Sequence, residues 1–364
     1  MKFTVSRETL LKPIQLIIGA VERRQTMPIL SNFLFRNVDG RLVITATDLE
    51  LEVSATLDVT SDGEPITVPG RKFMDICKSL PDTDQIAFSV KGDKVELKSG
   101  RSRFSLATLP AEEFPLVDSL EVQDSVTIGD EQLQSLIENT SFAMAQQDVR
   151  YYLNGLLLEI RQGMLRAVAT DGHRLALADC DLSSQIDVRQ IIIPRKAVHE
   201  FVRILNAAEG EIELAFSSNH LQAKLGDIHF VTKLIDGKFP EYQRVIPEGH
   251  EFIVTIDREA VRSGLMRASI LSNEKYRGIR LGFSKDCLKI QAHNPEQEEA
   301  EEEIEIDYQG PNLEVGFNVS YLLDVLNTIS TSEVDFHLQD SNSSLLIQTP
   351  ENERYKYVVM PMRL

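Results

Sequence analysis

The chain has 364 residues, of which 42% are apolar and 26% are charged, and its formal net charge is −18 at pH 7. This composition is typical of a folded globular protein and excludes a disordered chain. Since no run approaches the roughly 18 apolar residues that span a bilayer and no secretory signal is visible, we expect a cytoplasmic protein without a membrane segment.

Taken along the chain, the predicted elements repeat one pattern three times. Each copy opens with an amphipathic helix, continues with extended segments joined by turns such as Asp39-Gly40, and then begins a second amphipathic helix. The second helices start at near-equal spacing and place apolar residues at i, i+3, i+4 and i+7. The six helices are expected to begin after Ser6, near Pro69, after Asp130, near Pro194, after Asp257 and at a capping Asn318. We therefore predict three domains, 1–120, 121–245 and 246–364.

The three cysteines, Cys77, Cys180 and Cys287, lie far apart and show no metal-binding spacing. Cys77 belongs to the apolar stripe of a predicted helix, which favours a small buried hydrophobic residue over a disulfide or a ligand. We predict no metal site, no cofactor and a reducing compartment.

The segment Thr170-Asp-Gly-His-Arg174 is the best candidate for chemistry, because Asp171 and His173 lie close together. It can be read as a catalytic pair, as a turn held by hydrogen bonds or as part of a binding surface. A catalytic pair needs a nucleophile and an orienting group, and the sequence points to neither. No phosphate loop or hydrolase motif is present either. We therefore predict no catalytic residue and a protein that is not an enzyme.

The charge is unevenly distributed. Residues 294–307 contain a run of glutamates and no basic residue, which indicates a solvated face or an interface with a basic partner. Basic residues recur on or beside the predicted helices, and a basic helical face could hold DNA weakly. Composition alone does not choose between such a protein and an acidic enzyme. The basic residues include Arg7, Lys12, Arg23, Arg24, Arg71, Lys72, Arg150, Arg195, Lys196, Arg203, Arg262, Arg267, Lys275 and Arg277.

Several segments, spread over all three repeats, resemble the bacterial sliding clamps, the β subunits of DNA polymerase III. They include Thr47-Asp-Leu-Glu50, Gln147-Asp-Val-Arg-Tyr-Tyr-Leu-Asn-Gly155, Ala169-Thr-Asp-Gly-His-Arg-Leu175, Ile270-Leu-Ser-Asn-Glu-Lys275 and Tyr357-Val-Val-Met-Pro-Met-Arg363. The resemblance implies an α+β fold of three clamp-type domains, each with two helices packed on antiparallel sheet. It also implies a head-to-tail homodimeric ring around double-stranded DNA.

The resemblance further implies that the ring tethers the replicative polymerase, and that the clamp loader, translesion polymerases and repair proteins bind it through short peptides. A repeat scaffold that binds peptides without encircling DNA is the alternative. A hydrolase that uses Asp171 and His173 is a second rival.

The resemblance assigns residues to three surfaces. Phe104, which could also be ordinary core, and Leu106 would pack on Ile270 and Leu271 of a neighbour. Around them, Lys72, Arg101 and Arg103 would face Glu296, Glu298, Glu299, Glu301 and Glu302. DNA would be contacted by Arg24, Gln147, Arg150, Tyr151, Tyr152 and Lys196, although the tyrosines could instead help to pack the domain.

The third surface is a pocket for partner peptides. Its rim contains Met360 and Met362, whose flexible thioethers suit several peptide anchors, unless both side chains are core. The assigned residues are Leu153, Thr170, Gly172, His173, Arg174, Leu175, Pro240, Arg244, Val245, Asn318, Tyr321, Ser344, Val358, Met360, Pro361, Met362 and Arg363.

Overall fold

The computed structural model describes residues 1–22, 27–82, 85–117, 120–161, 163–183, 186–207, 209–249, 252–350 and 352–363. These ranges contain helices together with sheets whose strand pairs are antiparallel, so the predicted α+β class is confirmed. The chain forms two compact units, one of residues 1–134 with 196–234 and the other of residues 135–195 with 235–364. None of the helices in the described ranges is long and apolar enough to cross a membrane.

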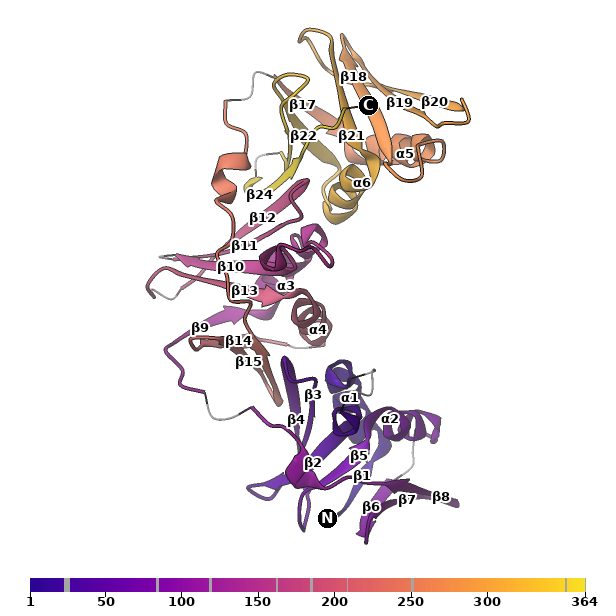
Figure 1. The fold of residues 1–364 in the computed structure, drawn as a ribbon, viewed down its shortest axis with the longest axis vertical. Coiled ribbons are helices and arrows are strands. Elements are labelled where there is room, and N and C mark those ends of the chain that lie inside the picture. The colour runs from indigo at the N-terminus through magenta and orange to yellow at the C-terminus, as the bar shows by residue number, and fades with distance from the viewer. Residues whose placement is uncertain are drawn as a thin grey trace. The chain divides into compact units, whose positions relative to one another are not determined.

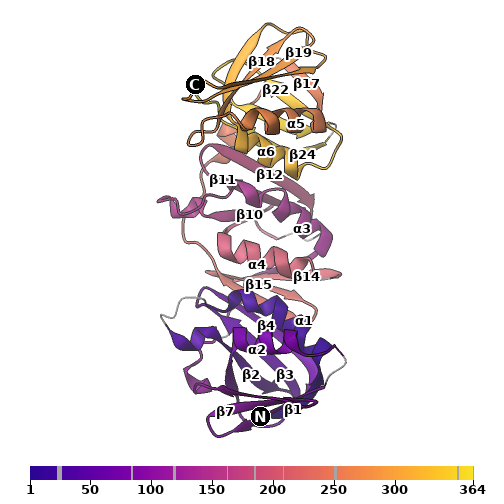
Figure 2. The ribbon, with the colours of Figure 1, turned by 90° about the vertical axis from the view of Figure 1, so that its right-hand side faces the viewer.

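The first unit combines an eight-stranded sheet, a four-stranded sheet and helices (Figure 1). The larger sheet has the order β5-β2-β3-β4-β16-β15-β14-β9, and the smaller has the order β1-β6-β7-β8. Helices α1 (Arg7–Ile17) and α2 (Gly70–Ser79) lie side by side against these strands, as Figure 2 also shows. The strands are β1 (Lys2–Ser6), β2 (Asn32–Val38), β3 (Arg41–Thr47), β4 (Leu51–Thr60), β5 (Ile66–Pro69), β6 (Gln85–Lys91), β7 (Lys94–Ser99), β8 (Ser102–Ala107), β9 (Asp124–Gly129), β14 (Glu211–Phe216), β15 (His220–Leu225) and β16 (Ile228–Lys233).

The second unit has the same plan. Its eight-stranded sheet has the order β13-β10-β11-β12-β24-β23-β22-β17, and its four-stranded sheet has the order β20-β19-β18-β21. Helices α5 (Arg258–Ser269) and α6 (Val319–Thr328) pack on each other. The strands are β10 (Gly155–Arg161), β11 (Met164–Thr170), β12 (Arg174–Asp181), β13 (Arg189–Pro194), β17 (Phe252–Asp257), β18 (Gly278–Ser284), β19 (Cys287–His293), β20 (Glu299–Glu305), β21 (Leu313–Asn318), β22 (Glu333–Leu338), β23 (Leu345–Thr349) and β24 (Asn352–Val359).

The middle third of the chain contributes strands to both units. Strands β9 and β14 to β16 complete the sheet of the first unit, whereas β10 to β13 belong to the sheet of the second. The chain leaves the first unit within α3 (Asp130–Glu138) and returns to it at the start of α4 (Arg195–Leu205). The three domain limits expected from the sequence stay a prediction.

Part of the core of the first unit is an aromatic cluster that joins both of its sheets to α2. The ring of Phe3 stacks on Phe88 at 4.5 Å, and Phe35 meets Phe73 edge to face at 5.3 Å. Phe73 is fully buried on the predicted apolar stripe of α2, together with Cys77. Burial raises the pKa of the Cys77 thiol to about 12, so this cysteine is an inert part of the core.

Three of the predicted helix starts are held by the expected capping side chains. The hydroxyl of Ser6 accepts a hydrogen bond from the amide of Thr9 at 3.1 Å. The carboxylate of Asp257 accepts one from Ala260 at 2.7 Å, and Asn318 accepts one from Ser320 at 2.9 Å. Each cap satisfies an amide of the first turn that has no partner inside its helix.

Arginines close the opposite ends of three helices. Arg7 donates to the carbonyl oxygens of Cys77 (2.8 Å) and Lys78 (3.1 Å) at the end of α2. Arg258 donates to Leu326 (3.1 Å) in the last turn of α6, and Arg203 donates to Leu16 (2.7 Å) in the last turn of α1. Two of these residues, Arg7 and Arg203, belong to the basic pattern seen in the sequence, so part of that pattern stabilises helix ends.

Candidate binding pocket

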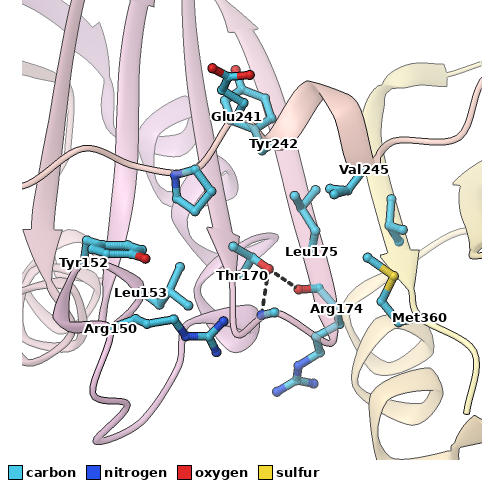
Figure 3. A pocket seen from close by; sticks show the side chains of 13 residues that line it. Arg150, Tyr152, Leu153, Thr170, Arg174, Leu175, Glu241, Tyr242, Val245 and Met360 are labelled. Atoms are coloured by element: carbon cyan, nitrogen blue, oxygen red, sulfur yellow. Dashed lines mark hydrogen bonds between the residues drawn. The ribbon is translucent and has the colours of Figure 1, made fainter.

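A cavity of about 160 Å³ opens on the second unit, where the ends of β11, β12 and β24 meet the segment after Phe239 (Figure 3). Figure 3 shows side chains from these elements pointing into one space. The lining residues are Arg150, Tyr152, Leu153, Thr170, Gly172, Arg174, Leu175, Pro240, Glu241, Tyr242, Val245, Val358 and Met360.

The cavity lies on an apolar face of the sheet. The segment after Phe239 covers only part of this face. Side chains of β10 to β13, β23 and β24 form a buried cluster there, and Phe239 and Tyr242 pack on it from the segment. Leu175 and Val358 belong to this cluster and also line the cavity. The exposed part of the cluster is therefore a ready apolar surface for a ligand side chain.

The segment Thr170-Asp-Gly-His-Arg174 is a hydrogen-bonded turn at the cavity floor. The Thr170 hydroxyl donates to the carbonyl of Arg174 (2.6 Å) and accepts from the amide of Gly172 (3.1 Å). The Asp171 carboxylate accepts from the amides of His173 (2.9 Å) and Arg174 (3.0 Å). Among the alternatives left open by the sequence, the geometry supports a turn held by hydrogen bonds.

The same turn occurs in the first unit, between β3 and β4. Thr47 donates to the carbonyl of Leu51 (2.9 Å) and accepts from the amide of Leu49 (3.1 Å). Asp48 accepts from the amides of Glu50 (3.0 Å) and Leu51 (2.7 Å). The third turn residue has positive φ in both copies, +87° at Gly172 and +79° at Leu49. A shared Thr-Asp pair therefore fixes a turn, which explains its repetition without any catalytic role.

Arg150 forms one edge of the cavity and is held in place by Asp148. Its guanidinium donates to the two carboxylate oxygens at 3.0 and 2.9 Å and to the carbonyl of Asp171 at 3.2 Å. The hydrogen bond from the Arg150 side chain is the main reason that the pKa of Asp148 falls to about 2. The pair is ionised at neutral pH and presents a fixed cation at the rim.

Arg174 binds the turn to helix α6. Its guanidinium donates to Asp171 (3.1 Å), to Asp324 and to the carbonyl of Phe142 (2.8 Å). The side chain is largely buried, at 12% exposure, and its planar group also lies over the Tyr321 ring. This arrangement fixes the position of the cavity floor relative to α6.

The structure brings many of the predicted pocket residues together at this cavity. They are Leu153, Thr170, Gly172, Arg174, Leu175, Pro240, Val245, Val358 and Met360. Met362 and Arg363 instead line a separate cavity of about 420 Å³, with Asn273, Tyr276 and His293.

The remaining predicted pocket residues line neither cavity. His173 stacks on Tyr321, with 6.3 Å between ring centres, and Ser344 donates to the sulfur of Met360 at 2.9 Å. Asn318 caps α6, Arg244 forms an exposed ion pair with Glu241 at 2.6 Å, and Pro361 is partly buried. Met360 and Met362 are also only partly buried, so neither belongs to the fully buried core.

The sequence did not assign four of the lining residues to this cavity. Arg150 and Tyr152 were expected at DNA, and the structure places them in the cavity wall. Glu241 and Tyr242 were not predicted at all, although they follow Phe239-Pro240 directly. An aromatic residue in a connecting segment is a signal that could have found Tyr242, because such a ring needs an apolar surface to cover.

Models of the DNA polymerase III beta subunit match the chain in three consecutive parts. The N-terminal domain matches residues 1–118, the central domain residues 127–241 and the C-terminal domain residues 243–363. The chain belongs to the DNA polymerase III beta subunit family.

Relatives in this family match the chain over its whole length. It is 54% identical to the beta sliding clamp of Pseudomonas aeruginosa and 46% identical to that of Escherichia coli, and both alignments cover 100% of each chain. A crystal structure of the P. aeruginosa sliding clamp bound to griselimycin has a TM-score of 0.96 and 54% identity, with 100% of each chain covered. The family resemblance inferred from the sequence is confirmed.

The residues expected at DNA lie in different parts of the structure. Gln147, Arg150, Tyr151 and Tyr152 share one loop of the second unit, in which Tyr151 is 57% exposed. Lys196 belongs to the first unit and pairs with Asp48 there. Arg24 falls outside the described residues. The assignment of these residues to DNA stays a prediction.

In the first unit, the residues expected at the subunit interface lie on β8 and α2. Strand β8 pairs with β7, and no strand in the described ranges pairs with its other edge. Phe104 is partly buried and Leu106 is buried. Lys72, Arg101 and Arg103 are exposed. This edge is open to an additional strand.

In the second unit, the expected interface residues lie after α5 and along β20. Ile270 is 76% exposed and Leu271 is partly buried. Strand β20 pairs only with β19 among the strands that the structure describes. Two of its glutamates already have partners in the chain, since Glu301 pairs with Lys289 at 2.9 Å and Glu302 pairs with Arg267 at 2.6 Å.

The other acidic residues of this group, Glu296, Glu298 and Glu299, are exposed. No group of three or more His, Cys, Asp or Glu residues that could hold a metal ion occurs in the described ranges.

Proposed function

We propose that this chain is a DNA sliding clamp, a homodimeric ring that encircles duplex DNA and tethers the replicative polymerase. The match of all three beta-subunit domains, in order and over the full length, carries this proposal. The comparisons do not favour a peptide-binding scaffold without DNA encirclement.

The two open sheet edges support closure of a ring. Strand β8 carries the partly buried Phe104 and the buried Leu106, with exposed cations beside them. Strand β20 carries glutamates and contacts α5, which the exposed Ile270 follows directly. A head-to-tail dimer joins β8 of one protomer to β20 of its partner, so that both edges are paired. The apolar contact supplies affinity, and the opposite charges set the register and the association rate.

A ring also accounts for the net charge of −18 in a protein that acts on DNA. A protein that holds DNA through phosphate contacts needs many free cations and loses affinity in salt. A closed ring holds DNA by topology, so that a weakly basic inner wall is enough and sliding remains possible. Such a ring needs no contacts to the base edges, which carry the sequence information, so it can move along a duplex of any sequence.

The cavity beside Thr170 supports recognition of short peptides. Its walls are mostly apolar, and Arg150, Arg174 and Glu241 provide charged groups at its margin. Such a site accepts Leu and Phe side chains of a linear peptide and orients the peptide through a few polar contacts. A relative in the family binds griselimycin, which supports the presence of a ligand site.

One pocket can serve several partners in turn. We assign it to the polymerase catalytic subunit, the clamp loader, translesion polymerases and repair proteins. The proposal includes no bond-making chemistry, and it places the protein in the bacterial cytoplasm, on the nucleoid during replication.

Retention on circular DNA tests the ring. The protein is loaded onto nicked plasmid with clamp loader and ATP, washed in high salt and analysed before and after one cut linearises the plasmid. We expect retention on the circle and loss from the linear form. Loss from both forms in high salt would indicate phosphate binding instead. Equal retention on both forms would exclude topological linkage.

A further inference from the structure

Tyr242 connects the binding cavity to a polar network on the sheet. Its ring lines the cavity and its side chain is 2% exposed. Its hydroxyl donates a hydrogen bond of 2.5 Å to the carboxylate of Glu159, which is itself 1% exposed. The same hydroxyl accepts a hydrogen bond of 3.3 Å from Arg166. One end of this side chain therefore belongs to the cavity, and the other is anchored beneath it.

The network below Tyr242 follows the register of four neighbouring strands. Gln190, Glu159, Arg166 and Asp179 are consecutive cross-strand partners on β13, β10, β11 and β12. Gln190 donates to Glu159 at 2.7 Å, and Arg166 donates to both carboxylate oxygens of Asp179 at 2.6 and 2.7 Å. Glu159 is buried, Arg166 and Asp179 are partly buried and Gln190 is exposed, and these hydrogen bonds together with those of Tyr242 join the four residues in one network.

The carboxylate of Glu159 is ionised despite its burial. Burial is the largest single influence and would raise its pKa. Hydrogen bonds from Arg161, Tyr242 and Gln190 outweigh that influence, and the pKa of Glu159 is lowered. The Tyr242 hydroxyl therefore meets a charged acceptor, which makes a stronger hydrogen bond than a neutral one.

The segment that carries Tyr242 borders two cavities. Tyr242 and Val245 face the binding cavity. The next residues, Ile246 and Pro247, line a separate groove of about 510 Å³, which Arg166 also lines. The short turn Tyr242–Val245 thus lies between two cavities, and Tyr242 is buried whereas the three residues that follow it in the turn are exposed. The packing of this turn on the sheet therefore depends on Tyr242.

We infer that Glu159 and Arg166 are positioning residues that hold Tyr242, and with it the cavity wall, in the shape that receives a partner peptide. This inference rests on the proposed function of the cavity as a peptide site. If the wall is already ordered before the peptide binds, binding does not have to order it, and the entropic cost of binding is smaller. The two positioning residues therefore increase affinity without contacting the peptide.

The test compares full-length variants with a matched control. Tyr242→Phe keeps the ring and removes only the hydroxyl, and Glu159→Ala removes its acceptor. Glu159→Gln restores an acceptor oxygen without the charge. The control is Tyr357→Phe, which also removes one buried hydroxyl in this unit, bonded to Asn139 at 3.0 Å, from a residue that does not line the cavity.

Two readouts are measured on each variant. The first is the fluorescence anisotropy of a labelled synthetic peptide with Leu and Phe anchors. The second is hydrogen–deuterium exchange of residues 239–247 without peptide, which reports the mobility of the wall itself. Thermal unfolding followed by circular dichroism gives the melting temperature of each of the four variants, so that a general loss of stability can be recognised.

We expect Tyr242→Phe and Glu159→Ala to weaken peptide binding by about three- to tenfold and to speed exchange in residues 239–247. Glu159→Gln should lie between Glu159→Ala and the parent, and Tyr357→Phe should bind and exchange in this segment like the parent. Unchanged exchange in Tyr242→Phe and Glu159→Ala overturns the inference, as does an equal loss of affinity in the control. If the parent binds no peptide, the proposed function of the cavity fails, and the exchange readout still decides whether the network holds the wall.

Discussion

The guanidinium carbon of Arg174 lies 4.7 Å from the centre of the Tyr321 ring. Arg174 begins β12 and Tyr321 lies in the first turn of α6, so this cation–π contact joins the sheet to the helix. The same guanidinium pairs with Asp171 and Asp324. The Arg174 side chain thus connects the turn at the cavity to α6. Its planar guanidinium allows it to make all of these contacts at once.

Arg174→Lys should therefore weaken both stability and peptide binding, although the charge is kept. A lysine cannot form the fork of hydrogen bonds or stack on Tyr321, and we expect a loss of about 1–2 kcal/mol in the free energy of unfolding. Urea denaturation followed by circular dichroism measures it. The control is Arg354→Lys, because Arg354 forms an exposed ion pair with Asp181 at 2.8 Å. Equal effects of the two substitutions would contradict the role given to Arg174.

A reciprocal pair of substitutions tests the repeated Thr-Asp turn. Gly172 has φ of +87° and a Cβ there would lie 3.0 Å from the Arg150 guanidinium, so Gly172→Ala should destabilise the protein by about 1–2 kcal/mol. Leu49 has φ of +79° at the equivalent position of the first unit. Leu49→Gly relieves this strain, and we expect a stability equal to the parent or higher by up to about 1 kcal/mol.

Thermal unfolding of both variants and of the parent provides the measurement. Gly172→Ala should also reduce peptide affinity, since it displaces Arg150 at the rim, whereas Leu49→Gly should leave peptide affinity unchanged. If Gly172→Ala unfolds at the parent temperature, the positive φ does not limit this turn.

Local patterns in the sequence predicted the helices and the repeat well. The stripe of Phe73 and Cys77 and the caps at Ser6, Asp257 and Asn318 are all found in the structure. Each of these features depends on residues within one or two helical turns, which is the range that periodicity and capping rules describe. The glutamate run was expected as a charged face and not as strand β20, because its apolar alternation is weak.

The cavity was only partly predictable because its wall comes from a segment without periodicity. Leu175, Val358 and Met360 were reached through the family resemblance and line the cavity. The role of Tyr242 depends on Glu159 and Arg166, which are distant in sequence and meet it only through strand register. Likewise, the helix-capping contacts of Arg7 and Arg203 could not be distinguished from DNA-facing positions without the tertiary fold.

The pair of Asp148 and Arg150 predicts a defined pH response. The hydrogen bond from Arg150 is the main cause of the lowered pKa of Asp148, about 2, so the carboxylate stays charged above that value. A lowered folded-state pKa stabilises the fold above the ordinary Asp pKa, and this contribution is lost as the pH falls toward 2.

The carboxyl carbon of Asp148, followed by NMR in protein labelled at aspartate, should thus keep its chemical shift between pH 7 and pH 4. In Arg150→Ala the shift should already move within this range. Identical titration curves in the two proteins would show that Arg150 does not hold Asp148.

Arg258 begins α5 and its side chain caps the end of α6, so it should contribute more to stability than Arg262, a partly buried arginine of α5. Arg258 donates to the carbonyl oxygens of Thr331 (2.7 Å) and Leu326 (3.1 Å), so Arg258→Gln should lower the free energy of unfolding by about 1–2 kcal/mol. Arg262, one turn further along α5, pairs with the exposed Glu259, and Arg262→Gln should change stability much less. Guanidinium denaturation measures the stability of each variant, and curves of equal slope allow their midpoints to be compared directly. Equal midpoints for the two variants would refute the capping role of Arg258.

The exposed Ile270 provides the sharpest test of ring closure. Ile270 is 76% exposed and follows α5, which contacts the open strand β20, so we expect a partner subunit to bury it. Ile270→Asp would bury an unpaired charge there, and we expect dimer dissociation to increase by about 100-fold or more. The control is Val188→Asp, at a residue with 66% exposure outside the predicted interface.

Sedimentation velocity at micromolar concentration distinguishes the outcomes. Ile270→Asp should sediment as a monomer with an unchanged circular dichroism spectrum, and it should no longer be retained on nicked plasmid. Val188→Asp should remain dimeric and be retained. A dimer of unchanged affinity in Ile270→Asp would mean that the subunits meet through another surface, because no apolar contact at this position could tolerate a buried carboxylate without loss of affinity.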